Sequence, residues 1–80
     1  MRIISEEGKF DVPYEHAVVF CEGTMLYVGL EKSQWMFAQY SDREMAQKAM
    51  DMLHDAYEGK YSSFRFPSEE FFRGGKHGEA

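Results

Sequence analysis

Few residues in this sequence could form a catalytic centre. Cys21 and His16 could act as a nucleophile and its base, but they stand five residues apart on one expected strand. Because side chains alternate between the two faces of a strand, these two point to opposite sides. Cys21 is therefore interpreted as a buried structural thiol. Asp51 and Asp55 lie one helical turn apart among polar residues, which is typical of a solvated surface. No active site, and hence no enzyme, is expected.

Metal and phosphate-loop motifs are also missing from the sequence. The histidines do not have the spacing of metal ligands. The run Gly74-Gly75-Lys76 lacks the spacing of a phosphate-binding loop. We therefore expect neither a metal nor a cofactor. The histidines are His16, His54 and His77.

Non-covalent binding of a phosphorylated ligand has better chemical support. A guanidinium group can contact phosphate through two parallel hydrogen bonds. Arg43 stands in the first turn of an expected helix, where free backbone N–H groups also favour an anion. Arg65 lies between two phenylalanines, and an adenine could stack on aromatic rings. The alternative is that the rings belong to the core and the arginines are solvated or paired with acids. The candidate ligand-binding residues are Arg43, Arg65, Tyr14, Trp35 and Phe72.

One amphipathic helix is expected over Ser41–Glu58, where apolar residues recur at helical spacing. Ser41 and Glu44 have the spacing of a capping box. Gly59 is expected to end the helix in the left-handed conformation. The helix should therefore lay an apolar face on a sheet. That face contains Met45, Ala46, Ala49, Met50, Leu53, Ala56 and Tyr57.

The remaining segments indicate short strands. The segment 9–15 contains Pro13, which places it at a sheet edge or in a connection. A helical turn starting at Ser68 could follow the last strand. The predicted fold is α+β, with an antiparallel sheet of about four short strands packed on the helix. Residues 1–72 should form a single domain, and 73–80 a flexible, disordered tail. The expected strands are 1–5, 16–22, 25–30, 34–40 and 61–66, of which 16–40 forms a meander.

Both faces of the expected meander are apolar, although one helix can cover only one face. The sequence pattern divides the side chains into two sets. Self-association or binding of another protein would bury the uncovered face. Alternatively, the C-terminal turn with Phe71 and Phe72 could fold back over it. The first set is Val18, Phe20, Leu26, Val28, Trp35 and Phe37, and the second is Ala17, Val19, Cys21, Met25, Tyr27, Met36, Ala38 and Tyr40.

Composition limits the classes of function. The chain has 80 residues, a net charge of −5 and a single cysteine, which rules out an intramolecular disulfide framework and fits a reducing cytoplasm. Excess negative charge argues against binding to duplex nucleic acid, which requires many lysine and arginine contacts. No apolar run is long enough to span a membrane, and the N-terminal residues lack a signal-peptide core.

Several segments together resemble a known group of small proteins. They are MRIIS with the following Glu6-Glu7-Gly8 turn, DVPYE at Asp11–Glu15, the run from Tyr40 to Gly59, and FRFPSEE at Phe64–Glu70. This combination is similar to proteins encoded by phages and mobile elements of Gram-positive bacteria, a group that resembles the phage anti-defence proteins countering the Thoeris immune system. The resemblance implies a sponge, an oligomer whose protomers together form pockets that capture an immune signal without cleaving it. The signal would be a cyclic ADP-ribose-like molecule or a cyclic oligonucleotide.

Two functions therefore follow from the sequence, and a purely structural or assembly role for a mobile element is a third possibility. The first hypothesis is a homo-oligomeric anti-defence protein in the cytoplasm of a bacterial host, which sequesters a nucleotide-derived signal. The alternative is an acidic inhibitor that binds a host defence effector, such as a nuclease, directly. Its negatively charged residues would meet a basic groove, and the apolar strands would add contact area. Those residues are Glu44, Asp51, Asp55 and Glu58.

Overall fold

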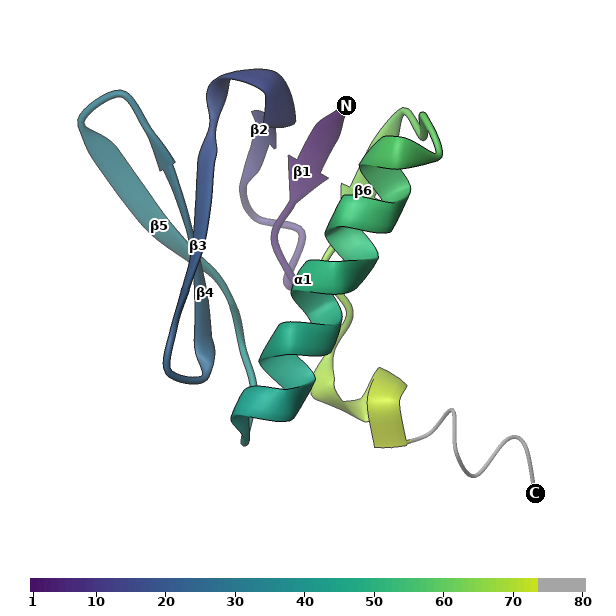
Figure 1. Ribbon diagram of the computed structural model, residues 1–80. Coiled ribbons are helices and arrows are strands. Elements are labelled where there is room, and N and C mark those ends of the chain that lie inside the picture. Colours follow the sequence, from purple (N-terminus) through teal and green to yellow (C-terminus); the bar gives the residue numbers. More distant parts are fainter. Residues whose placement is uncertain (74–80) are drawn as a thin grey trace.

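The computed structural model describes residues 1–73, which form two three-stranded sheets and one long helix, α1 (Figure 1). The α+β class is confirmed. The prediction of one sheet of about four strands is wrong, because the strands divide into the orders β2-β1-β6 and β3-β4-β5. The elements are β1 (Arg2–Ile4), β2 (Asp11–Pro13), a 3-10 turn η1 (Tyr14–His16), β3 (Val18–Glu22), β4 (Met25–Leu30), β5 (Ser33–Gln39), α1 (Arg43–Glu58) and β6 (Ser63–Arg65).

The sheet β3-β4-β5 is the predicted antiparallel meander. Two-residue turns join its strands, and Gly23 and Glu31 take the positive φ angles (65° and 58°) that such turns require. The register shifts between Leu26 and Tyr27, because Tyr27 pairs with Met36 while Leu26 pairs with Ala38. The extra residue, Phe37, forms a β-bulge. As a result Phe37 and Ala38, although consecutive, are both buried, at 2% and 3% exposure.

The second sheet joins segments that are far apart in the sequence. Ile3 in the central strand β1 pairs with Val12 of β2 in antiparallel register and with Phe64 of β6 in parallel register. Pro13 ends β2 at the edge of the sheet, as its missing N–H requires. The segment 9–15 was predicted to be either an edge strand or a connection, and it contains the edge strand β2.

Helix α1 starts at Arg43, two residues later than predicted, and ends at Glu58 as predicted. Its cap is Asp42, whose carboxylate accepts a 2.8 Å hydrogen bond from the backbone N–H of Met45, so the Ser41 capping box is wrong. At the other end Gly59 has φ −79°, and Lys60 takes the left-handed conformation with φ 62°. The backbone N–H of Gly59 still closes the helix on the carbonyl of Asp55 at 2.8 Å.

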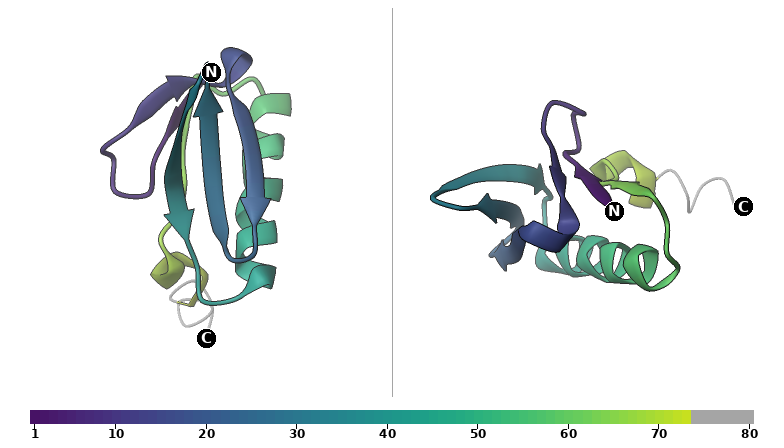
Figure 2. Two further views of the ribbon diagram at one scale, coloured as in Figure 1. Left: turned by 90° about the vertical axis from the view of Figure 1, so that its left-hand side faces the viewer. Right: turned by 90° about the horizontal axis from the view of Figure 1, so that it is seen from above.

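The core lies between the helix and the two sheets. Ala46, Ala49 and Leu53 of α1 are fully buried against side chains from both sheets. Figure 2 shows α1 behind the β3-β4-β5 sheet, on its inner face, with the small sheet beside it. No helix within residues 1–73 has the length and the apolar character needed to cross a lipid bilayer.

A short helical turn over 69–73 follows the last strand. The backbone N–H of Phe71 donates to the Ser68 carbonyl at 3.0 Å, so the turn starts where the sequence placed it. Arg73, which was assigned to the tail, belongs to this turn and pairs with Glu69. The rest of the predicted disordered tail, 74–80, lies outside the described residues.

Candidate binding site

Arg65, the first predicted phosphate ligand, holds the backbone together. Its Nε and one terminal nitrogen donate to the carbonyl of Glu6 at 3.1 and 2.9 Å. The guanidinium carbon lies 3.4 Å from the point where a Cβ on Gly8 would stand. Arg65 therefore fastens the β1–β2 turn to β6, and two of its nitrogens already donate to an acceptor.

Arg43, the second predicted phosphate ligand, is the first residue of α1 and is exposed. Arg2 pairs with Asp11, Arg65 binds the Glu6 carbonyl, and Arg73 pairs with Glu69. Within residues 1–73, Arg43 is the arginine that forms neither a hydrogen bond nor an ion pair through its side chain. It remains available to an anion.

The three predicted stacking rings lie in different places. Tyr14 packs on Tyr57 near the end of α1, with ring centroids 4.5 Å apart. The ring centroid of Trp35, on β5, lies 5.8 Å from that of Phe10 in the β1–β2 loop. Phe72 contacts the edge of Tyr40 at 5.7 Å. The structure of one chain therefore does not bring the five predicted ligand residues into one pocket.

The residues examined for catalysis lie on the surface. Cys21 is exposed, and its thiol lies 3.4 Å from the Gly23 carbonyl, so its interpretation as a buried thiol is wrong. The Asp51 carboxylate accepts a hydrogen bond from Gln47 at 3.1 Å, as a solvated helical pair does. No group of three histidine, cysteine or acidic side chains in residues 1–73 could hold a metal ion.

The outer face of the β3-β4-β5 sheet carries an uncovered apolar patch, which shares the face with Glu22, Gln34 and Gln39. The register places Phe20 opposite Tyr27 and Tyr27 opposite Met36, so these side chains share one face. Val18 is 65% exposed and Met36 is 45% exposed. No other element of the described chain lies in front of this surface (Figure 2, left). We call this surface, formed by Val18, Phe20, Met25, Tyr27 and Met36, the outer sheet face.

The residues of this face differ from the predicted division. The sequence pattern grouped Val18 and Phe20 with Leu26 and Val28, but β3 pairs with β4 in a register that puts Leu26 and Val28 on the inner face. The alternative of a cover by the C-terminal turn is also wrong, because Phe72 packs against Tyr40 and lines a small pocket beside Met45.

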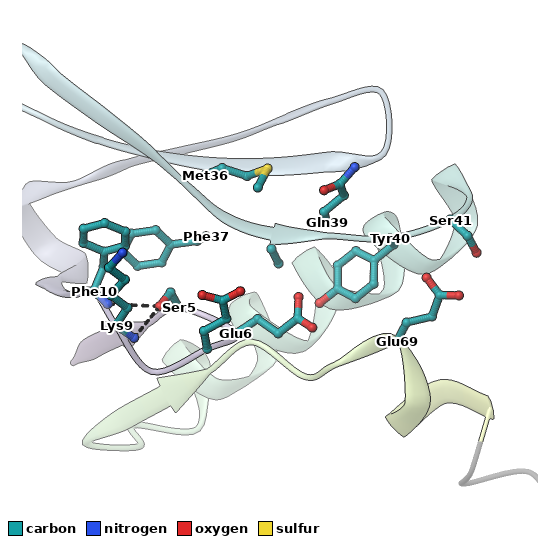
Figure 3. Close-up of a pocket in the computed structure, with 12 residues that line it drawn as sticks. Ser5, Glu6, Lys9, Phe10, Met36, Phe37, Gln39, Tyr40, Ser41 and Glu69 are labelled. Carbon is teal, nitrogen blue, oxygen red and sulfur yellow. Dashed lines mark hydrogen bonds between the residues drawn. The ribbon is translucent and has the colours of Figure 1, made fainter.

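A cleft of about 490 Å³ lies between β5 and the β1–β2 loop (Figure 3). The loop contributes Glu6 and Glu7, and the turn at 69–73 contributes Glu69. The close-up shows Tyr40 between the side chains of Glu6 and Glu69. None of the five predicted ligand residues lines this cleft. The lining residues are Ser5, Glu6, Glu7, Lys9, Phe10, Met36, Phe37, Ala38, Gln39, Tyr40, Ser41 and Glu69.

Hydrogen bonds fix the walls of the cleft. The Ser5 hydroxyl, which is buried, accepts from the backbone N–H groups of Lys9 and Phe10, both at 3.0 Å. The N–H of Glu6 donates to the carbonyl of Phe37 at 2.8 Å, joining the loop to β5. The Tyr40 hydroxyl donates to the Pro67 carbonyl at 2.6 Å. Burial, and then the Glu6 charge, raise the pKa of Tyr40, which keeps this phenol protonated.

Sequence reasoning missed the cleft because its walls come from three separate segments. The sequence did contain one signal, the acidic Glu6-Glu7-Gly8 segment, but it was interpreted only as a turn after the first strand. Comparison with protein-family models, with curated proteins and with solved structures finds no match to this chain. The site therefore has to be interpreted from its own geometry.

Proposed function

We propose that this protein acts without catalysis, as an acidic binding protein that docks on a host protein such as a defence effector. The observation that carries this proposal is the outer sheet face, whose apolar side chains are left uncovered by residues 1–73. Aromatic residues and methionine are enriched at protein interfaces. Burial of a few hundred Å² of this face would contribute several kcal/mol, at about 25 cal/mol per Å².

Charge on the rest of the surface supports a basic partner. The chain carries a net charge of −5, and the solvent side of α1 is lined by exposed carboxylates. Two copies of the chain, each with a net charge of −5, would repel each other, whereas a basic protein would be attracted. The exposed carboxylates of the helix are Glu44, Asp51, Asp55 and Glu58.

The proposal is tested by affinity purification from a host in which the protein is active. Phe20→Asp places a charge in the outer sheet face, and Gln47→Asp places the same charge on the exposed side of α1. We expect one partner to copurify in fixed stoichiometry with the wild type and with Gln47→Asp, and to be lost with Phe20→Asp. Circular dichroism must show both variants folded. Equal partner recovery with both variants would exclude the outer sheet face as the binding surface.

A second candidate is the sponge that captures a nucleotide-derived signal, and Arg43 favours it. This guanidinium has no partner within residues 1–73 and lies at the N-terminus of a 16-residue helix, where an anion is stabilised. The aromatic residues needed for stacking would have to come from other protomers. Native mass spectrometry of the same purification separates the candidates, since a sponge is an oligomer that releases an intact nucleotide and loses it in Arg43→Ala.

A further inference from the structure

We propose that the cleft beside β5 binds the cationic end of a lysine or arginine side chain, carried by the protein that covers the outer sheet face. This inference rests on the proposed function and adds the chemistry of the partner. The partner would present an apolar surface with a basic residue at its border.

The shape of the cleft fits a long side chain with a charged end. Phe10 and Phe37 stack with centroids 5.9 Å apart and form an apolar wall along which an aliphatic stem can lie. The ammonium of Lys9 lies 5.8 Å from the centroid of the Phe10 ring. Lys9 thus already occupies the cation position at Phe10, and a guest would place its charge nearer to Glu6 and Glu7.

The charge in the cleft favours a cationic guest. The lining contains three carboxylates and one ammonium group. Glu69 is paired with Arg73, but the carboxylates of Glu6 and Glu7 form no ion pair with any other side chain in residues 1–73. A guanidinium or ammonium group entering the cleft would supply the missing counter-charge.

The carboxylate of Glu6 belongs to a segment that is already held in place. Its backbone N–H binds Phe37, and its carbonyl binds the guanidinium of Arg65. A guest therefore finds the loop ordered and does not lose free energy by ordering it on binding. This is the functional consequence of using Arg65 to fasten the loop.

The cleft and the outer sheet face meet on β5. Met36 belongs to the outer sheet face and also lines the cleft. A protein that covers the sheet would therefore bring its border residues directly to the cleft. A second copy of this chain is a poorer occupant, because each copy has a net charge of −5.

The test is a titration of the ¹⁵N-labelled protein with acetyl-Gly-Arg-Gly-amide, followed by NMR. A peptide with citrulline in place of arginine has nearly the same shape without the charge and serves as the control ligand. We expect shifts at the amides of Glu6, Phe10 and Ala38 with the arginine peptide and none with the citrulline peptide. Equal shifts with both peptides, or none up to the solubility limit, would overturn the inference.

Matched variants locate the interaction. Glu6→Gln/Glu7→Gln removes two charges from the cleft, and Asp55→Asn/Glu58→Gln removes two from the far end of α1. We expect the arginine peptide to bind at least about tenfold more weakly to the first variant, as the loss of charge-assisted contacts requires, and unchanged to the second. Equal weakening in both variants would show a general effect of net charge and would overturn the site.

The same titration separates this inference from the proposed function. Phe20→Asp should bind the arginine peptide like the wild type, even though it loses the partner protein. If the peptide binds in the cleft but Phe20→Asp keeps its partner, the proposed function fails and the cation site stands. If Phe20→Asp loses its partner and the arginine peptide does not bind to the wild type, the cation site fails and the proposed function stands. Dimerisation of the wild type that shifts the cleft amides without peptide would identify a second copy as the occupant and overturn the assignment to a different protein.

Discussion

At the scale of single residues, Tyr40 joins three parts of the molecule. Its backbone N–H donates to the carbonyl of Thr24, its ring contacts Phe72, and its hydroxyl binds the carbonyl of Pro67. Tyr40 is 3% exposed, and it lines the cleft. This one side chain therefore links β5 to the segment that carries Glu69.

Replacement of Tyr40 by phenylalanine should lower the free energy of unfolding by about 1 to 2 kcal/mol, because the Pro67 carbonyl loses its donor. Urea denaturation measures this, with Tyr61→Phe, a change at an exposed tyrosine, as the control.

The contribution of Tyr40 to the free energy of unfolding also depends on pH. Burial raises the pKa of Tyr40, so its contribution is complete below the tyrosine value of roughly 10 and is lost as the pH rises further. Tyr40→Phe should flatten this alkaline loss, and an unchanged alkaline profile would contradict the assignment.

The start of α1 gives a second prediction at this scale. Asp42→Ala should destabilise the protein by about 1 kcal/mol, since it removes the acceptor for the Met45 N–H. Ser41→Ala should change the stability little, because the Ser41 hydroxyl points to the sulfur of Met45 at 3.9 Å. Thermal unfolding of both variants decides between the two caps. A larger loss in Ser41→Ala would restore the capping box expected from the sequence.

At the scale of elements, the features with a strong local pattern could be predicted from the sequence. The helix has a 3.6-residue period over its whole length, and the meander has turn residues between β-branched runs. The sheet of β1, β2 and β6 could not be predicted, because three-residue strands have no readable period and their partners are remote. The bulge at Phe37 could not be predicted from the sequence either. Together with the register of β3, this bulge determines which side chains face outward.

The candidate binding site could also be predicted only in part from the sequence. An uncovered apolar face was correctly expected from the two apolar sets, but its members were assigned wrongly, since Phe20 belongs with Tyr27 and Met36. Arg65 was interpreted as a ligand residue because nothing in the sequence shows that the Glu6 carbonyl lies beside it. Contacts between residues 59 positions apart depend on the fold as a whole.

At the scale of the whole molecule, the outer sheet face and the exposed side of α1 point away from each other. The outer sheet face lies on one side of the β3-β4-β5 sheet, and α1 with its exposed carboxylates lies on the other (Figure 2). The carboxylates of the cleft beside Met36 and the net charge of −5 would attract a partner over a distance, and apolar contact would hold it on the sheet. Attraction during association and contact in the formed complex should respond differently to salt.

Salt should slow association with the partner and leave dissociation nearly unchanged. Charge acts over distances that salt screens, with a Debye length of about 8 Å at physiological ionic strength, whereas apolar contacts are insensitive to it. Rates measured by surface plasmon resonance at increasing salt test this. Glu6→Gln/Glu7→Gln, next to the outer sheet face, should reduce the salt dependence of association, and Asp51→Asn/Asp55→Asn on the far side should change it less. An association rate independent of salt in the wild type would contradict electrostatic attraction.

The parallel pairing of β1 with β6 also constrains how the protein is made. The ribosome releases β1 first, but the strand that flanks it on one side, Ser63–Arg65, is among the last described segments to emerge. Ile3 is fully buried in the complete fold, and it cannot be buried in this way before Phe66 has been synthesised. The strands of the meander, in contrast, can already pair during synthesis. Nascent chains stalled before β6 should therefore present an exposed N-terminal strand, and this is the stage at which a chaperone would recognise the protein.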